Sequence, residues 1–439
     1  MKIAPTLVRD KLKSAILGVS NVGWMYSKNP KADFSRNRKL PMAVMLNLLL
    51  KFSGKGLQEE LCELYQPFKM PEKVPTKAAF VMQRKKLLPD ACYVLFRSFT
   101  DSLPFMKLFN GYRLLACDGS SVPIPRNENE LDYSVVTRED RKSYNQLHIN
   151  GLFDILNRIF VDCILEPSMH THERAALTAM VHRFPHPEKA IFLADRGYEG
   201  YNGLAHLLED FANFVIRAKD LDSNGFLRAL HLPVDGDLDI DISRILVFNV
   251  PKAHRHDDRY VKVYRGHFDP LDNGSANSYP IQFRLVRFQL PNGSYECLVT
   301  NLPRDRFPAK RLAKLYHLRW GIENAYRDLK YPIDLLHFHG KSAQAVLQEV
   351  FCTLSMFNFC AYICVHSDVL RLSKSTKYRY KINFANAVGP CRSYLHGRIG
   401  EAELLDRLRL SPTPIRPDRQ APRGRIKEQS SREFNYRAS

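Results

Sequence analysis

The feature that most constrains the fold is a change of period near residue 111, where helical spacing gives way to short runs of β-branched and aromatic residues. The strands expected from these runs are Arg113–Cys117, Leu147–Leu156, Arg158–Leu165, Ala190–Ala194 and Asn213–Ala218. Helices are expected between the later strands, at Glu173–Phe184 and Asn202–Phe211. Three strands followed by alternating helix and strand predict an α/β fold with a mixed sheet.

The regions on either side of this sheet are predicted to be mainly helical, with one inserted β-region. The expected helices are Leu40–Phe52, Leu57–Tyr65, Thr76–Leu88, Pro308–Lys330, Ala343–Val365 and Phe384–Leu410. Three further strands alternate with turn-forming clusters and predict an antiparallel insertion: Leu238–Phe248, Tyr260–Phe268 and Ile281–Leu290. From Pro412 onward the chain is rich in Pro and Arg, which predicts a disordered basic tail.

The charge is strongly positive and unevenly placed. The chain has 65 Lys and Arg against 46 Asp and Glu, a net charge of +19, which favours a polyanionic partner such as nucleic acid. Residues 1–110 hold 19 basic and 8 acidic side chains, so more than half of the excess lies there. A turn at 53–56 and a basic segment with Arg84, Lys85 and Lys86 are compatible with a helix-turn-helix module or, alternatively, a helical cap with a solvated basic face.

Composition argues against several other classes of protein. Nine scattered cysteines never show C-x-x-C spacing and are interpreted as small buried residues rather than zinc or redox ligands. No signal peptide and no GxxxxGK[ST] phosphate loop is recognised, so no nucleotide cofactor is expected. The apolar stretch Val350–Val365 is short for a bilayer and is interpreted as a buried helix. We therefore expect a cytoplasmic protein without a membrane segment.

The strongest signal for chemistry lies in the helix expected at 311–330. At about 100° per residue, one face gathers Tyr316, Arg319, Glu323, Arg327 and Lys330. The opposite face gathers the apolar residues Leu318, Ile322, Ala325 and Leu329, which are expected to be buried while the polar stripe faces outward. Taken alone, this pattern also fits an ordinary solvated helix.

Two more carboxylates come directly after predicted strands. Asp118 follows Leu114–Cys117, and Asp195 follows Ile191–Ala194. Strand ends are where α/β folds place ligand-binding groups, and a Gly lies within two residues of each Asp. If the two strands are neighbours and the helix packs on the sheet, both side chains meet Glu323 at one point. Three hard oxygen ligands would suit two Mg²⁺ or Mn²⁺ ions and in-line phosphoryl transfer.

These residues resemble a known family. The spacing of Tyr316, Arg319, Glu323 and Lys330 resembles the YREK signature of the bacterial insertion-sequence DDE transposases, a group of RNase H-like cut-and-paste enzymes. The string Asp195–Tyr198 resembles that group's second-Asp motif, and Leu115–Ser120 resembles its first. The resemblance covers about residues 110–340.

The resemblance implies the roles of individual residues. Asp118, Asp195 and Glu323 would be the catalytic metal ligands, and the DNA contacts would come from Tyr316, Arg319, Lys330, Arg196 and Tyr198. It also implies the reaction: strand hydrolysis, hairpin formation and reopening, and strand transfer of an insertion sequence, carried out on two transposon ends and target DNA by a homodimer. Some relatives place a stacking Trp where this chain has Glu296, beside Tyr295, so use of a hairpin stays open.

Two other functions remain open: an RNase H-like nuclease or resolvase without strand transfer, and an inactive DNA-binding repressor derived from a transposase. Two His-containing clusters, His254 to Asp258 and His170 to Glu173, lack a recognised ligand spacing; the first is interpreted as a solvated loop and the second as a helix start.

The expected regions are 1–108 (helical, DNA-binding), 109–220 (RNase H-like catalytic core, first part), 221–296 (β-strand insertion), 297–366 (core, second part), 367–411 (helical C-terminal region) and 412–439 (disordered basic tail).

Overall fold

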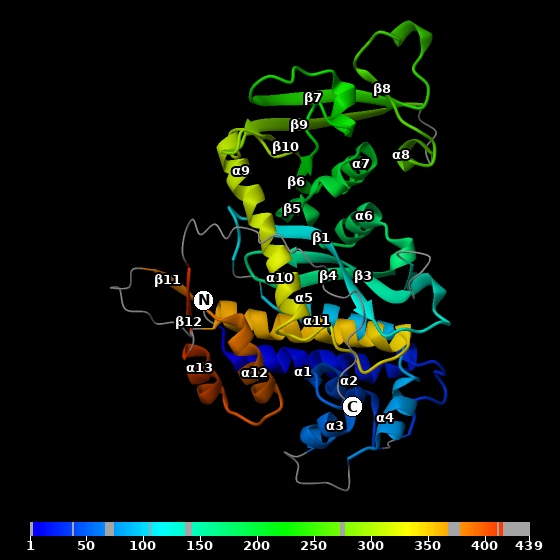
Figure 1. The fold of residues 1–439 in the computed structure, drawn as a ribbon, viewed down its shortest axis with the longest axis vertical. Coiled ribbons are helices and arrows are strands. Elements are labelled where there is room, and N and C mark those ends of the chain that lie inside the picture. The colour runs from blue at the N-terminus through cyan, green and yellow to red at the C-terminus, as the bar shows by residue number, and fades with distance from the viewer. Residues whose placement is uncertain are drawn as a thin grey trace.

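The centre of the protein is one long mixed sheet with helices on both faces and a helical layer beyond one end, as the computed structural model shows (Figure 1). The structure describes residues 3–36, 39–65, 74–104, 107–136, 143–272, 277–367, 378–410 and 412–415. The predicted tail beyond residue 415 lies outside these residues.

The first half of the sheet has the RNase H order. Its strands are β1 (Arg113–Ile124), β3 (Tyr144–Asp154), β4 (Ile159–Pro167), β5 (Ala190–Ala194) and β6 (Asn213–Ala218). They lie in the order β4-β3-β1-β5-β6, with β3 antiparallel to β1 and β4, and with β1, β5 and β6 parallel. The crossover helices are α6 (Glu173–His182) and α7 (Tyr201–Glu209), and a short strand β2 (Ser134–Val135) pairs with β3. The predicted mixed α/β fold is therefore confirmed.

The second half of the sheet is the inserted β-region, at the top of Figure 1. Strand β10 (Tyr295–Thr300) pairs antiparallel with β6, and the sheet continues through β9 (Tyr279–Gln289), β7 (Leu238–Val247) and β8 (Tyr260–Lys262). The insertion thus extends the core sheet edge to edge. The strand expected to reach Phe268 ends at Lys262, since the chain turns at Gly266 (φ +75°) and then forms the short helix α8 (Asp269–Asp272).

Alternation along the strands explains why both faces of the sheet are covered. Leu114, Ile191, Leu193 and Val215 share a face and pack against α9 (Ala309–His317) in one apolar cluster. The neighbouring positions, such as Phe192, point the other way and join the larger core that includes α6 and α7. Parallel strands buried on both faces are nearly continuous apolar runs, which is why β5 was predictable to the residue.

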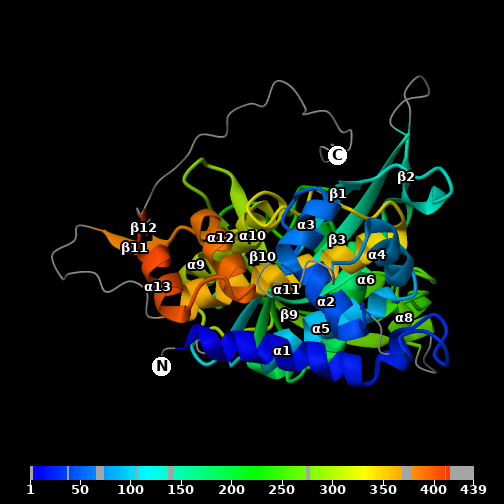
Figure 2. The same ribbon diagram turned by 90° about the horizontal axis from the view of Figure 1, so that it is seen from below.

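The helical layer is built around α11 (Ala343–His366), which runs beneath the sheet in Figure 1. On its far side from the sheet lie N-terminal helices, seen from below in Figure 2. These helices are α1 (Pro5–Asn21), α2 (Met42–Lys51), α3 (Leu57–Tyr65) and α4 (Lys77–Arg84), whereas α5 (Pro89–Ser102) packs against both α11 and strand β4 of the sheet. C-terminal elements complete the layer: β11 (Arg379–Ile382), α12 (Phe384–Leu395), α13 (Glu401–Arg409) and β12 (Pro412–Ile415).

Helix α11 is long and apolar enough to cross a membrane by length and composition, and within the described residues it is the one helix that passes this test. However, 89% of its apolar window is buried inside the protein. The interpretation of this stretch as a buried core helix is therefore confirmed.

Three predictions for the helical layer are wrong. The helix expected at 384–410 is two helices, because the chain reverses at Gly397 (φ +74°). Residues 412–415, assigned to the disordered tail, form strand β12, which pairs with β11. Cys62 is exposed on α3 rather than buried.

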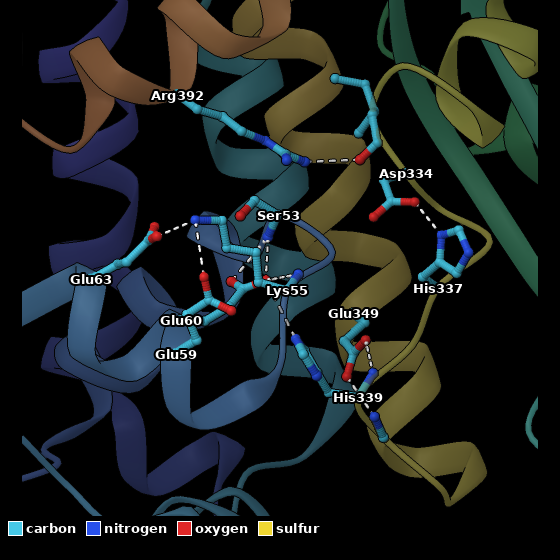
Figure 3. Close-up of polar contacts among 12 residues, drawn as sticks. Ser53, Lys55, Glu59, Glu60, Glu63, Asp334, His337, His339, Glu349 and Arg392 are labelled. Carbon is cyan, nitrogen blue, oxygen red and sulfur yellow. Dashed lines mark hydrogen bonds and ion pairs between the residues drawn. The ribbon is translucent and has the colours of Figure 1, made fainter. Parts of the chain in front are cut away.

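Buried charged side chains link the N-terminal helices to α11 and to the loop before it; Figure 3 shows the contacts of Glu60 and Glu349. Arg84 Nη1 lies 2.7 Å from Glu349 Oε1, and both side chains are buried. Glu349 also accepts the backbone N–H groups of His339 and Gly340, at 2.9 and 2.8 Å. On the other side of His339, Glu60 accepts the N–H groups of Ser53 and Lys55. Arg84 is thus buried between the N-terminal helices and α11, so its expected place on an exposed basic face, in either of the two alternatives, was wrong.

Candidate active site

The helix expected at 308–330 is interrupted by one tighter turn. Helix α9 ends at His317, residues Leu318–Trp320 form a 3₁₀ turn, and α10 (Gly321–Lys330) continues the path. A 3₁₀ turn has three residues per turn instead of 3.6, so the side chains within it rotate further than the uniform helical spacing assumes. As a result Arg319 is only 1% exposed, whereas Leu318 is 37% exposed. The predicted burial of Leu318 was wrong, and so was the outward orientation of Arg319 and of Tyr316, which is 3% exposed.

The sequence suggested that Asp118 lies at the end of a strand, but in the structure it lies inside strand β1. Strand β1 continues to Ile124 because β3 pairs with it well beyond that point, with Asp118 opposite Gly151. Its other neighbour, β5, pairs with β1 only up to Ala116 and then ends, immediately before Asp195. Asp118 therefore lies where β1 extends past the end of β5.

Alternation places both Asp side chains on the sheet face covered by α9 and α10. Asp118 shares the orientation of Leu114, and Asp195 continues the series of Ile191 and Leu193, which contact α9. The structure thereby brings Asp118, Asp195 and Glu323 together, as the sequence analysis expected.

The three carboxylates surround one cation, Arg319. Its guanidinium nitrogens lie 3.8 Å from Asp118 Oδ2, 3.8 Å from Asp195 Oδ2 and 3.0 Å from Glu323 Oε1. The arginine is buried, while the three carboxylate side chains are 25%, 31% and 41% exposed. The site therefore opens to solvent on its carboxylate side.

The electrostatics of this cluster are unbalanced. Burial, with the charges of Glu323 and Asp195, raises the pKa of Asp118 to about 6, against the lowering effect of Arg319 and the Gly119 N–H group. Arg319 therefore lowers the pKa of Asp118 by less than burial and the two neighbouring carboxylates raise it. The pKa of Tyr316 is raised, mainly by burial, so this phenol is protonated; its hydroxyl lies 3.5 Å from Asp195 Oδ1.

A second arginine, missed by the sequence analysis, contacts the cluster. Arg217 Nη2 lies 2.8 Å from Asp195 Oδ1, and Arg217 Nη1 lies 3.7 Å from Glu296 Oε2. Arg217 shares the sheet face of Val215, so its position in the alternation of β6 was an available signal. Glu296, where a stacking Trp was sought, is therefore paired with a cation.

The hydroxyl of Tyr326, which the sequence did not point to either, supports the backbone at Asp118. It donates toward the backbone oxygens of Asp118 (2.8 Å) and Ile149 (3.0 Å), and the side chain is 5% exposed. A Cβ at Gly151 would come within 2.6 Å of this hydroxyl oxygen, so the glycine makes room for it.

On the other face of the sheet, Glu173 and His148 pack beneath the first Asp motif. His148 Nε2 lies 3.2 Å from Glu173 Oε1, and His148 Nδ1 lies 3.0 Å from Ser121 Oγ. A Cβ at Gly119 would come within 2.2 Å of Glu173 Oε1, so only glycine fits there without a shift. The sequence pattern had indicated only a helix start at Glu173, so this contact with His148 was not predicted.

Three other residues were expected to contact DNA, namely Lys330, Arg196 and Tyr198, and they differ in their exposure to solvent. Lys330 Nζ donates to the backbone oxygen of Ser121 at 2.9 Å and is partly buried, and Arg196 is exposed beside Asp195. Tyr198 is 3% exposed and belongs to the core.

Among the residues that the structure describes, no three His, Cys, Asp or Glu side chains are arranged to hold a metal ion. At the carboxylate cluster, the Arg319 guanidinium lies among the side chains and each carboxylate approaches it. In the cluster His254 to Asp258, which the sequence also suggested, Asp257 pairs with Arg259 at 2.8 Å. His254 stacks on Tyr260, with 4.5 Å between the ring centroids.

Comparison with known families decides the class of this chain. The family model for the transposase DDE domain matches residues 109–359, more than half of the chain and all three carboxylates. The protein belongs to the DDE transposase domain family. No curated protein matches this DDE transposase domain protein. Among solved structures, the chain matches a cryo-EM structure of the piggyBac transposase synaptic complex with hairpin DNA, at 10% identity and a TM-score of 0.45, over 93% of this chain and 82% of that one.

Proposed function

We propose that this protein is a DNA transposase that excises an insertion sequence and integrates it into target DNA, with Asp118, Asp195 and Glu323 as its catalytic residues. The observation that carries the proposal is the convergence of these carboxylates, from β1, from the end of β5 and from α10, on one guanidinium. All three lie within the matched DDE domain.

The chemistry of this cluster fits two Mg²⁺ or Mn²⁺ ions. Three carboxylates supply hard oxygen ligands, and burial, together with the charges of Glu323 and Asp195, raises the pKa of Asp118. When bound, the ions would activate the attacking oxygen and stabilise the leaving oxygen of an in-line displacement.

The side chains around the carboxylates would hold the DNA strand. Arg319 has planar donors that match a phosphate, and it already lies among the carboxylates, so it would orient the scissile phosphate. Tyr316 and Lys330 would position it from either side, and the exposed Arg196 would contact the backbone beyond. Because Tyr198 is buried, we assign it to support of the second Asp motif rather than to DNA.

The reaction would proceed in two displacements of the same kind. In the first, a water oxygen attacks a phosphorus, the bond to the 3′ oxygen breaks, and that oxygen takes up a proton to leave a 3′-OH. In the second, this 3′-OH attacks a phosphorus of the target, loses its proton, and releases a target 3′ oxygen. We propose no hairpin step, because Glu296 is paired with Arg217 and the guanidinium of Arg287 lies 3.7 Å from the ring centroid of Tyr295. A homodimer at two DNA ends stays a prediction, as does the cytoplasmic location.

Cleavage of a linear DNA that carries the element's end, with Mg²⁺, tests the proposal. Wild type should free a 3′-OH end, and addition of a supercoiled plasmid should yield joined product. Glu323→Gln should bind the same DNA but cut at least about a thousandfold more slowly, since loss of about 4 kcal/mol of transition-state stabilisation is expected.

The matched control is Asp328→Asn on the same helix, whose carboxylate pairs with Arg158 at 2.9 Å instead of Arg319. It should cut as wild type does. If Glu323→Gln also cuts as wild type does, Glu323 is not catalytic and the proposal fails. Cutting without any joined product would favour the nuclease alternative.

A further inference from the structure

A cavity of about 540 Å³ lies in the helical layer, bounded by α1, α2, the end of α3 and the end of α12. These helices are on the side of α11 away from the sheet that carries the carboxylates (Figure 1). The size of the cavity is within the usual range of ligand sites, about 300–1,000 Å³. It is separate from the candidate active site.

The charged residues that line this cavity are the basic Arg9, Lys13 and Lys51; burial lowers the pKa of the His396 imidazole to about 3, so this lining residue is neutral. Arg9 and Lys13 come from α1, Lys51 from the end of α2 and His396 from the turn after α12, and no Asp or Glu is among the lining residues. Lys13 and Lys51 have no carboxylate partner within the part of the chain that the structure describes. The cavity thus gathers positive charge that the fold itself leaves unneutralised.

Several buried nitrogen atoms here lack hydrogen-bond partners. Both ring nitrogens of His396 and Nε of Arg9 are buried and unpaired within the described residues, and Arg9 Nε lies 3.9 Å from the nearest ion-pair oxygen, that of Asp10. Buried polar atoms are almost always satisfied in native proteins, so three such atoms in one place require an explanation. An anionic ligand with several oxygens would supply acceptors for Arg9 Nε and for the single N–H group of the neutral His396 imidazole.

The surroundings would strengthen binding of such a ligand. The guanidinium of Arg9 is held over the ring of Tyr394, at 4.7 Å from the centroid, and apolar side chains of α1 and α2 form much of the lining. In an apolar setting an ionic attraction is stronger than at the open surface. Burial, with the neighbouring charges of Lys13 and Arg398, lowers the pKa of Lys51 to about 8, in keeping with crowded cations that lack an anion.

We propose that this cavity is a phosphate-binding site, which takes either a backbone phosphate of DNA or a free phosphate compound. Arginine, lysine and the imidazole N–H together offer donors to several oxygens of one tetrahedral group. If the phosphate belongs to DNA, the site deepens the proposed function and rests on it; if it belongs to a free compound, the site stands independently.

The double variant Lys13→Gln/Lys51→Gln tests the site with inorganic pyrophosphate as the probe, by titration calorimetry on the full chain at constant ionic strength. Its affinity for pyrophosphate should fall by about tenfold or more, since two charge-assisted hydrogen-bond donors are lost. The thermal midpoint without ligand should not fall, because removing crowded cations relieves repulsion. The matched control, Lys28→Gln/Lys31→Gln, removes the same charge from exposed positions outside the cavity and should bind as wild type does.

Salt dependence of duplex DNA binding separates the two sources. For a DNA phosphate, the slope of log K against log salt should become shallower by about 0.9 in the cavity variant but not in the control. For a free phosphate compound, pyrophosphate binding should fall while this slope stays that of wild type. If neither quantity changes, or if the control loses pyrophosphate binding equally, the site is refuted. DNA cleavage by wild type is a separate readout, so failure of the proposed function would not be mistaken for failure of this site.

Discussion

Two clusters of charged side chains, one beside the sheet and one in the helical layer, contain carboxyl groups whose pKa values are shifted in opposite directions. Glu349 is almost fully buried, yet its pKa is lowered, because Arg84, His339 and backbone N–H groups outweigh the effect of burial. Asp118 is less buried, yet its pKa is raised to about 6, because burial and two nearby carboxylates outweigh Arg319 and one backbone N–H group. The cluster around Glu349 is satisfied, because its charges and hydrogen-bonding groups are paired within the protein, and it stabilises the fold. The cluster around Asp118 is unsatisfied, which is typical of a site that binds a ligand.

The largest expected effect on stability comes from breaking the satisfied cluster. Glu349→Gln would leave Arg84 as an uncompensated buried charge, so the free energy of unfolding should fall by about 3–5 kcal/mol. Urea unfolding at neutral pH measures this change. The exposed pair of Glu403 and Arg407 offers the control, since Glu403→Gln should change stability by less than about 1 kcal/mol. Equal effects from both variants would contradict a structural role for Glu349.

In the unsatisfied cluster around Asp118, removal of a charge is expected to raise the free energy of unfolding instead of lowering it. Without divalent cations, Asp118→Asn should raise the free energy of unfolding at pH 7.5 by about 1–3 kcal/mol, because it removes a carboxylate whose pKa is higher in the folded state.

The same pKa shift predicts how this gain depends on pH. A raised carboxyl pKa destabilises the folded state where Asp118 is ionised, so the penalty is complete above about pH 6 and disappears as the pH falls toward 3.8. The difference between Asp118→Asn and wild type should therefore shrink between pH 7 and pH 4. Thermal midpoints across this range, with a chelator present, measure it. A gap that widens on acidification would show that Asp118 is stabilised as the carboxylate.

The smallest effect is expected behind the cluster, where Tyr326→Phe removes one hydroxyl shared by two backbone oxygens. Loss of this buried hydrogen bond should cost about 1–2 kcal/mol of stability. The exposed Tyr264 is the matched control, and Tyr264→Phe should leave the unfolding midpoint unchanged. A neutral effect at Tyr326 would mean that its hydroxyl does not support the Asp118 backbone.

The amino-acid sequence by itself determined the elements whose signal is local. The apolar run at Ala190–Ala194, the six residues of β6 and the amphipathic α3 were predictable, because burial on one or two faces leaves a periodic pattern. The three carboxylates were also recognisable, since two adjoin apolar runs and the third shares a helix face with basic residues.

Only the tertiary structure decided how these pieces meet. The length of β1 depends on β3, a strand that pairs with it across the sheet, so Asp118 lies inside a strand rather than at its end. The burial of Arg319 depends on one 3₁₀ turn, which a uniform helical period does not predict. Arg217, Tyr326, His148 and the basic cavity come from segments far apart in the chain. Their contacts arise from packing between elements, and single-sequence periodicity carries no information about such contacts.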